Sequence, residues 1–219
     1  EILIDFEEKS ENIIPTQMDL NIIYEDEYYI VINKPSGIAI HPSILHYTDS
    51  LANGVKFYFE QKNIKKKIRP INRLDKDTSG LIIVAKNDKA HINMSEQIKE
   101  RNVKKTYIAL VRGNVPEEEA TINMPIGRST KDRKKMAVDK KGKEAITEFK
   151  VLKRYDGYTL LEVKIKTGRT HQIRVHLSEI GYPVIGDEVY SNGKNQWNIK
   201  GQCLHAKSLK FKHPVTKKE

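Results

Sequence analysis

The chain has 219 residues and carries 39 Lys and Arg against 29 Asp and Glu, which gives a formal net charge of +10. This length predicts one domain with a short additional segment, and it is sufficient to bury a core without disulfides or metals. The longest strongly apolar runs, such as residues 81–85, are too short to span a membrane, and the single Cys203 excludes a disulfide scaffold or a cysteine-rich zinc site.

The first half of the chain is predicted to combine strands with two helices. A buried strand is expected over 28–32, and the Lys-Pro-Ser-Gly sequence at 34–37 predicts a turn after it. The apolar spacing over 49–63 predicts a helix. Residues 81–85 have the length of a central strand, and a second helix is expected over 87–101.

The second half is predicted to be richer in strands. A strand is expected over 106–111, and the segments 145–152 and 159–167 alternate apolar and polar residues with period two. We expect Thr170 to cap a following helix that ends at Gly181. Because strands outnumber helices and do not strictly alternate with them, the sequence predicts an α+β fold.

The charge is distributed unevenly along the chain. Residues 1–28 hold nine acidic residues and one basic residue, a net charge of −8, so the remaining residues carry +18. Dense basic segments lie at 62–69 and 128–143. A solvated surface explains any single lysine, but two dense clusters favour a nucleic-acid partner. The acidic amino-terminal segment lacks the apolar core of a signal peptide, so we expect a cytoplasmic location.

The first segment with candidate chemistry is RLDKDTSGLIIVAK at 73–86. Its aspartates imitate the start of a calcium loop, but the twelfth position, where a bidentate Glu belongs, is Lys86. Two interpretations of the segment stay open. It provides a carboxylate for chemistry beside Arg73, or it is a turn in which Asp75 or Asp77 binds backbone amides.

The second segment is GRTHQIRVHL at 168–177, where a predicted strand leads into a helix. Free amides at the start of a helix favour an anion, and Arg169 and Arg174 add two guanidinium groups. The anion could be a phosphate or a protein carboxylate. His171 and His176 are five residues apart and do not form the i, i+4 metal pair of a zinc protease, so no metal site is expected. Nucleotide loops and nucleophile elbows are absent from the sequence, so no cofactor is implied.

Five ordered segments resemble the RluA-type family of RNA pseudouridine synthases. They are Lys34–Pro35, Asn72–Gly80 (with Asn in place of the usual His), Lys105–Tyr107, Arg169–His176 and Leu204–Ala206. The resemblance covers about residues 19–216. It implies a mixed, largely antiparallel sheet flanked by helices and loops, with a catalytic domain over 19–219. Residues 1–18 would then be a linker or the tail of an upstream RNA-binding module of the ribosomal-protein type.

The resemblance implies an isomerase that converts specific uridines in structured RNA. Ribosomal RNA is the expected substrate, with transfer RNA as the alternative, and the family uses a single catalytic aspartate on a flipped-out base. Asp75 matches this aspartate, and Arg174 matches the arginine that pairs with it. Tyr107 matches the tyrosine whose ring stacks on uracil and whose hydroxyl helps to remove the carbon-5 proton.

The same resemblance implies a set of residues around the substrate. Arg73 is expected to enter the space vacated by the flipped base or to bind backbone phosphate. The remaining candidate substrate- or RNA-binding residues are Lys34, Arg169, His171, Gln172 and Leu204. Asn72 cannot titrate near neutrality, which makes an acid–base role at this position doubtful. We expect a monomer without a membrane partner.

Two functions of other classes compete with this interpretation. A non-catalytic RNA-binding or ribosome-assembly module would use the basic segments equally well. A metal-free nucleoside or glycoside hydrolase would use Asp75 and Asp77 together, since such enzymes need two carboxylates, and it would release free uracil or sugar.

Overall fold

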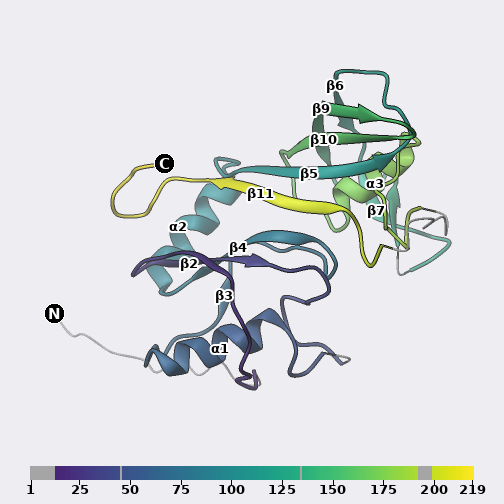
Figure 1. The fold of residues 1–219 in the computed structure, drawn as a ribbon. Coiled ribbons are helices and arrows are strands. Elements are labelled where there is room, and N and C mark those ends of the chain that lie inside the picture. The colour runs from purple at the N-terminus through teal and green to yellow at the C-terminus, as the bar shows by residue number, and fades with distance from the viewer. Residues whose placement is uncertain (1–12, 45, 134, 192–198) are drawn as a thin grey trace.

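The computed structural model describes residues 13–44, 46–133, 135–191 and 199–219, and in these ranges the chain forms three helices and eleven strands (Figure 1). The helices are α1 Leu51–Gln61, α2 Asp88–Lys99 and α3 Gln172–Glu179. The strands are β1 Ile22–Glu25, β2 Tyr29–Lys34, β3 Arg69–Pro70, β4 Ser79–Ala85, β5 Lys104–Arg112, β6 Glu119–Asn123, β7 Ile126–Arg128, β8 Met136–Val138, β9 Ile146–Tyr155, β10 Tyr158–Ile165 and β11 Leu204–Lys210.

Nine strands form one sheet with the order β1-β2-β4-β11-β5-β10-β9-β6, and β3 pairs with β4. The pairing of β4 with β11 is parallel, and the other pairings in this sheet are antiparallel. Strands β7 and β8 form a separate antiparallel pair. This mixed, largely antiparallel sheet with three helices confirms the predicted α+β fold.

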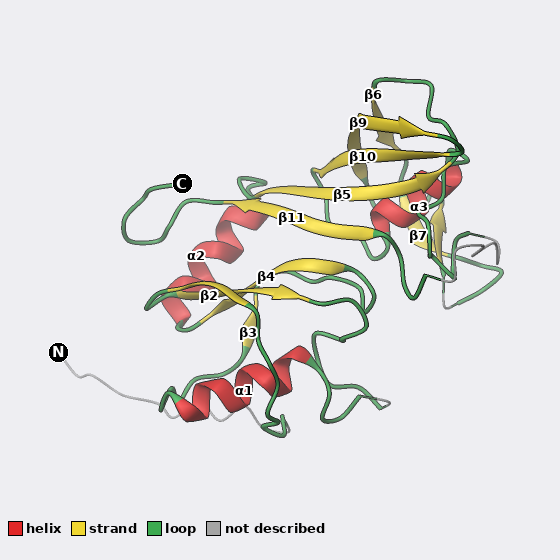
Figure 2. Ribbon diagram, in the orientation of Figure 1, coloured by secondary structure: helices red, strands yellow, loops and turns green. Residues whose placement is uncertain are grey.

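Helices α1 and α2 lie on opposite faces of the β2–β4 half of the sheet (Figure 2). The alternation of side chains along a strand explains this arrangement. Ile30 and Ile32 of β2 pack in the cluster that contains Val55 of α1, whereas Tyr29 packs in the cluster that contains Met94 of α2. Both predicted helices in this half are therefore confirmed.

Helix α3 covers the other half of the sheet. Its Ile173 and Leu177 pack with Leu161 and Val163 of β10 in one apolar cluster. The predicted cap at Thr170 is wrong, because α3 begins at Gln172 and His171 occupies the N-cap position. His171 has a φ of +56°, so the chain turns through a left-handed residue before it becomes helical.

Strand β11 joins the two halves, because it lies between β4 and β5 although it is the last strand in the sequence. Its Ala206 pairs with Gly80 of β4 on one side and with Tyr107 of β5 on the other. A Cβ atom at Gly80 would lie 2.4 Å from the Ala206 carbonyl oxygen, and the φ of Gly80 is +114°. The close approach of these strands therefore requires glycine.

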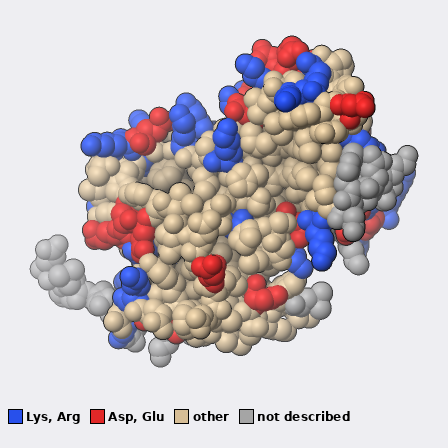
Figure 3. All heavy atoms as spheres, in the orientation of Figure 1, with Lys and Arg blue, Asp and Glu red and all other residues tan. Residues whose placement is uncertain are grey.

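Residues 1–12 of the predicted upstream segment lie outside the described residues. Residues 13–18 contact α1, since the Asn53 side chain donates to the Ile14 carbonyl at 2.7 Å. No helix among the described residues is long and apolar enough to cross a membrane. On the face drawn in Figure 3, basic and acidic side chains form small separate groups rather than one continuous basic stripe.

Candidate active site

A cavity of about 560 Å³ opens where the two halves of the sheet meet. It is bordered by the turn before β4, the start of β5, the carboxyl end of α2 and the segment that enters α3. Among the described residues that line it, seven are cations and one, Asp75, is a carboxylate. The cations are Arg73, Lys99, Arg101, Lys105, Lys166, Arg169 and Arg174. A cavity with this balance of charge suits an anionic ligand.

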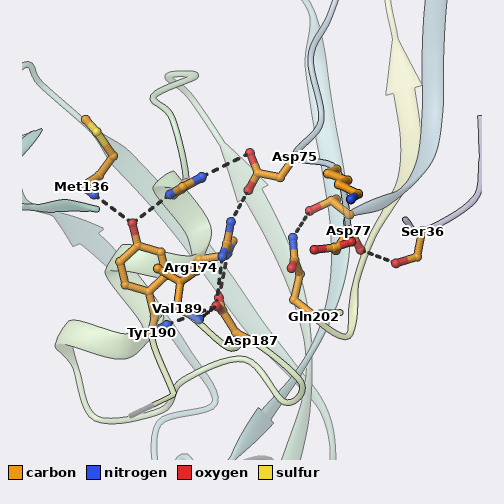
Figure 4. Close-up of polar contacts among 12 residues, drawn as sticks. Ser36, Asp75, Asp77, Met136, Arg174, Asp187, Val189, Tyr190 and Gln202 are labelled. Atoms are coloured by element: carbon orange, nitrogen blue, oxygen red, sulfur yellow. Dashed lines mark hydrogen bonds and ion pairs between the residues drawn. The ribbon is translucent and has the colours of Figure 1, made fainter. Parts of the chain in front are cut away.

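Asp75 and Arg174 form an ion pair inside this cavity (Figure 4). Nη1 of Arg174 donates to Oδ2 of Asp75 at 2.8 Å, and the two side chains are 6% and 27% exposed respectively. The residues lie 99 positions apart in the sequence. The predicted pairing of these two residues is therefore present in the structure, and the anion that Arg174 binds is a protein carboxylate.

Arg174 also binds a second, fully buried carboxylate, Asp187. Its Nε and Nη2 donate to the two oxygens of Asp187 at 2.7 and 2.9 Å, and the backbone amides of Val189 and Tyr190 donate to Oδ1. Burial disfavours the charged arginine, but its hydrogen bonds to Asp187 and Asp75 and their charges raise its pKa above the ordinary value. Arg174 therefore stays charged, and Asp187 fixes its orientation toward Asp75.

His171 lies on the other side of Asp75, with Nε2 3.9 Å from Oδ1 of the carboxylate. Burial lowers its pKa, although the charge of Asp75 acts in the opposite direction. The Tyr190 hydroxyl accepts a hydrogen bond from the Met136 amide at 2.9 Å and lies 2.8 Å from Nδ1 of His171. This pattern favours a neutral imidazole, in which Nδ1 accepts a hydrogen bond from the Tyr190 hydroxyl and the Nε2–H group faces Asp75.

Tyr107 forms part of the cavity wall on β5 and is 6% exposed. It belongs to the apolar cluster under α3, so its ring is held by packing. Burial, together with the charge of Asp75, raises its pKa to about 12. The hydroxyl group is therefore protonated over the whole physiological pH range.

Asn72 has a structural role at the edge of the cavity. Its Nδ2 donates to the Leu81 carbonyl and its Oδ1 accepts the Ile83 amide, both at 2.9 Å. The side chain thus uses both ends of its amide to bind the backbone of β4 directly behind the turn that carries Asp75. An amide satisfies this donor and acceptor pair without any change of protonation.

The prediction that Lys34 lines the pocket is wrong, because its side chain is 0% exposed and the cavity does not include it. Its Nζ donates to the carbonyls of Pro35, Ile38 and Lys76 at 2.8, 2.9 and 2.8 Å. Burial lowers its pKa to about 8, against the charges of Asp77 and Asp75. Lys34 therefore holds the backbone of the turn that carries Asp75 from behind.

Gln172 borders the cavity, but its amide group is used inside the protein. Its Oε1 accepts the Arg169 amide and the Thr167 hydroxyl, and its Nε2 donates to Ile146 and Thr147. The predicted contact of this side chain with substrate is therefore corrected to a role in shaping the turn before α3. Arg169 also lines the cavity, and its Nε donates to the Glu144 carbonyl at 2.8 Å.

The other two predicted residues lie where the sequence placed them. Leu204 is buried and contributes to the cavity wall at the start of β11. Arg73 is exposed at the rim, and no hydrogen bond or ion pair links it to any described residue. Arg73 is therefore available to a ligand.

A second carboxylate for hydrolysis is not available in the described cavity. Asp77 does not line it, and its backbone carbonyl accepts the Ser36 hydroxyl on the far side of the turn (Figure 4). Asp187 is occupied by Arg174. The described residues also contain no cluster of three potential metal ligands. The arrangement offers one carboxylate beside one arginine.

Sequence reasoning missed Asp187 and Tyr190. Both follow Gly186, which has a φ of +76°, in a segment that no motif marked. An Asp after a glycine in a predicted loop resembles an ordinary turn residue, because only the folded chain shows that Arg174 lies opposite. The one available indication was that a buried arginine needs a carboxylate partner.

Comparison with known proteins places residues 28–179 within a family described as RNA pseudouridylate synthase. An uncharacterized RNA pseudouridine synthase of Bacillus subtilis (strain 168), YlyB, is 44% identical over 208 residues, which cover 94% of this chain and 68% of that protein. Ribosomal large subunit pseudouridine synthase D of Borreliella burgdorferi is 42% identical over 226 residues, covering 99% of this chain and 69% of that protein.

Solved structures give the same result for the fold. Human RNA pseudouridylate synthase domain containing 1 superposes with a TM-score of 0.74 and 32% identity, over 87% of this chain and 78% of that one. Human RNA pseudouridylate synthase domain containing 4 superposes with a TM-score of 0.69 and 26% identity, over 86% and 83% of the two chains.

Proposed function

The chain belongs to the RNA pseudouridylate synthase family, and from this premise we propose that it isomerises uridines of ribosomal RNA with Asp75 as its catalytic residue. Such an enzyme is an isomerase, since it breaks the bond from ribose to N1 of uracil and rejoins the same base through carbon-5. The observation that carries the assignment of Asp75 is its ion pair with Arg174 inside a cavity where it is the one described carboxylate.

Access to the glycosidic bond requires that the uridine leaves its base stack. Flipping a nucleotide costs a few kcal/mol, which contacts inside the protein must offset. The cavity has a size suited to one nucleotide, and its seven cations favour the phosphates on either side. These features support a flipped-out uridine as the bound state.

Asp75 has two possible chemical roles, and both need an ionised carboxylate. It attacks the ribose carbon, or it removes a ribose proton to give a glycal. Nη1 of Arg174 donates to this carboxylate at 2.8 Å and positions it. A second carboxylate is not required, because uracil leaves as a delocalised anion and needs no proton from an acid, in contrast to the sugar leaving group of a glycosidase.

Tyr107 is proposed to hold the detached base. Its ring is fixed by packing in the cavity wall, which suits stacking on uracil while the base turns. Its hydroxyl starts the reaction protonated, since its pKa is about 12. It therefore acts first as a hydrogen-bond donor to the detached uracil anion. It can accept the carbon-5 proton only after its own proton has passed to N1 of that base, so one proton moves from carbon-5 to N1 and the tyrosine is regenerated.

Ribosomal RNA is proposed as the substrate on the strength of relatives that are named for the large ribosomal subunit. Those relatives are 37–42% identical and match more than 90% of this chain. The monomeric state and the cytoplasmic location stay predictions from the sequence.

Release of tritium from carbon-5 tests this proposal. Ribosomal precursor RNA that carries tritium at carbon-5 of uracil is incubated with the native protein, with Asp75→Asn and with Asp77→Asn. We expect release by the native protein and by Asp77→Asn, and a rate at least about 10³-fold lower for Asp75→Asn because the reacting carboxylate is lost.

Product analysis completes the experiment. Pseudouridine should replace uridine in a ratio of one to each tritium released. Free uracil as the product would show that the reaction is hydrolysis and not isomerisation. Equal loss of activity in Asp75→Asn and Asp77→Asn would contradict the assignment of Asp75. Transfer RNA as a better substrate than ribosomal RNA would overturn the proposed substrate and leave the chemistry intact.

A further inference from the structure

We propose that Lys105 binds a backbone phosphate of the RNA next to the flipped uridine. This assignment rests on the proposed function and names a substrate contact that the catalytic pair does not provide. It follows from the position of the residue on β5, from its burial, and from the partners of the other cations in the cavity.

Lys105 and Tyr107 lie on the same face of β5, because side chains two positions apart in a strand point to the same side. The row continues into the core with the fully buried Ala109 and Val111. Lys105 is therefore the position where this row leaves the core and enters the cavity. The rise of the strand places its Cα about 7 Å from that of Tyr107.

Four of the other six cations that line the cavity have acceptors within the protein. Arg174 binds Asp75 and Asp187, Arg101 pairs with Glu144, and Lys166 pairs with Glu148, while Arg169 donates to a carbonyl. No hydrogen bond or ion pair links Nζ of Lys105 to any residue that the structure describes. Arg73 and Lys99 also have none among these residues, but both are exposed to water.

The burial of Lys105 distinguishes it from those two exposed residues. Its side chain is half-buried, and Ile98, Val103 and Ile165 are among the apolar residues that line the same cavity. Burial alone lowers its pKa. A shielded ammonium group without an anion is costly, so a bound anion would stabilise it. Phosphates are the anions that an RNA substrate supplies.

Binding of pentauridylate, a five-nucleotide RNA with a fluorescent label, tests this assignment without any need for turnover. The affinity is measured from low to moderate salt for Lys105→Gln, Lys105→Arg and Lys104→Gln, each combined with Asp75→Asn. Lys104 is the matched control, because it is the neighbouring exposed lysine, lies on the opposite face of β5, and gives the same change of charge.

We expect Lys105→Gln to weaken binding about tenfold at low salt and to reduce the slope of log K against log salt by about 0.7, the loss of one phosphate contact on a single strand. Lys105→Arg should keep both values, and Lys104→Gln should change the affinity less than about twofold. Equal effects of the two glutamine substitutions, or no binding by the parent protein, would overturn the assignment.

Pentauridylates with one uncharged methylphosphonate at each linkage in turn then locate the contact. A methylphosphonate at one of the linkages should weaken binding to the protein that has Lys105, and the same methylphosphonate should not weaken binding to Lys105→Gln any further. If the losses of affinity from the methylphosphonate and from Lys105→Gln add fully at every linkage, a direct contact is contradicted. Tritium release is measured separately. A protein that isomerises uridine but shows no such coupling refutes the Lys105 contact alone, and a protein that shows the coupling without isomerisation refutes the proposed function alone.

Discussion

Arg174 is shared between two carboxylates of unequal accessibility. Asp187 is fully buried and binds the arginine through two hydrogen bonds, while Asp75 is partly exposed to the cavity and receives one. A bidentate pair with a fixed geometry leaves Nη1 pointing in one direction. Asp187 is therefore a positioning residue, which holds the arginine in the orientation in which it binds Asp75.

Replacing Asp187 by Asn tests this role. The substitution keeps the shape but leaves a buried guanidinium with one carboxylate, so we expect unfolding to become about 3 kcal/mol easier and the rate of tritium release to fall about 10- to 100-fold. The loss should appear mainly in the rate at saturating RNA, with little change in RNA affinity, because Asp187 is fully buried and does not line the cavity.

The matched control is Glu148→Gln, which removes one carboxylate from an exposed pair with Lys166. Its free energy of unfolding should change by less than about 1 kcal/mol. A purely structural role of Asp187 would lower stability without lowering the rate measured at a temperature where the variant is folded, and that result would contradict the positioning role.

Residues with a distinctive motif could be placed from the sequence, and those defined by tertiary contacts could not. Asp75, Tyr107 and Arg174 were expected in one site and do line one cavity. Lys34 and Gln172 belong to the same motifs, yet their polar atoms are used within the protein. A motif identifies a neighbourhood, and only the folded chain decides which side chains in it face the ligand.

At the scale of elements, the parallel contact of β4 with β11 positions the turn that carries Asp75. The pairing is short, with Ser79 opposite His205 and Gly80 opposite Ala206. A hydrogen bond of 2.9 Å between the Ser79 hydroxyl and Nδ1 of His205 adds to it. The turn at Asp75 directly precedes this contact, so displacement of β4 would move the carboxylate away from Arg174.

Gly80→Ala is predicted to disrupt this contact. The new Cβ would lie 2.4 Å from the Ala206 oxygen, so one of the strands must shift, and we expect a loss of at least about 3 kcal/mol in stability together with most of the activity. Gly157→Ala is the control, because Gly157 also has a positive φ of +79° but nothing lies within 4 Å. Its cost should be about 1 kcal/mol, without loss of activity. Equal costs would refute the steric argument.

The three helices and the strands β2, β4, β5, β9 and β10 were predictable, because their apolar residues occupy buried positions at regular spacing. The short strands β1, β3, β6, β7 and β8 were not predicted. The start of α3 was not, since the left-handed His171 replaces the expected cap at Thr170. The strand order was not predictable either. Placing β11 between β4 and β5 depends on contacts between segments about 100 or more residues apart, such as Ser79 with His205, which local periodicity does not encode.

At the scale of the whole molecule, the two halves of the sheet have separate cores that meet at the cavity. Each half buries a tyrosine, and burial changes the pKa of its hydroxyl group. The pKa of Tyr29 in the first half and that of Tyr107 in the second are both raised to about 12, chiefly by burial. Both hydroxyl groups are therefore neutral in the folded protein well above pH 10.

This difference predicts a loss of stability in alkali. Tyrosine in the unfolded chain loses its proton near pH 10, so from pH 10 to 12 the unfolded state binds fewer protons and the free energy of unfolding falls. The free energy of unfolding should fall by about 2 kcal/mol for each tyrosine. In Tyr107→Phe, the part of this fall that Tyr107 causes should be missing. Urea unfolding at several pH values measures this, with Tyr47→Phe, at an exposed position, as the control. An unchanged pH dependence in Tyr107→Phe would contradict the prediction.

The position of β11 also has a consequence for protein synthesis. A ribosome makes this strand after every other strand of the sheet, and it is the strand that aligns the turn of Asp75 with β5 and α3. Because β11 pairs with β4 on one side and with β5 on the other, the turn of Asp75 and β5 have no common framework until residues 204–206 leave the exit tunnel. We therefore expect a nascent chain to gain activity only after β11 has been made.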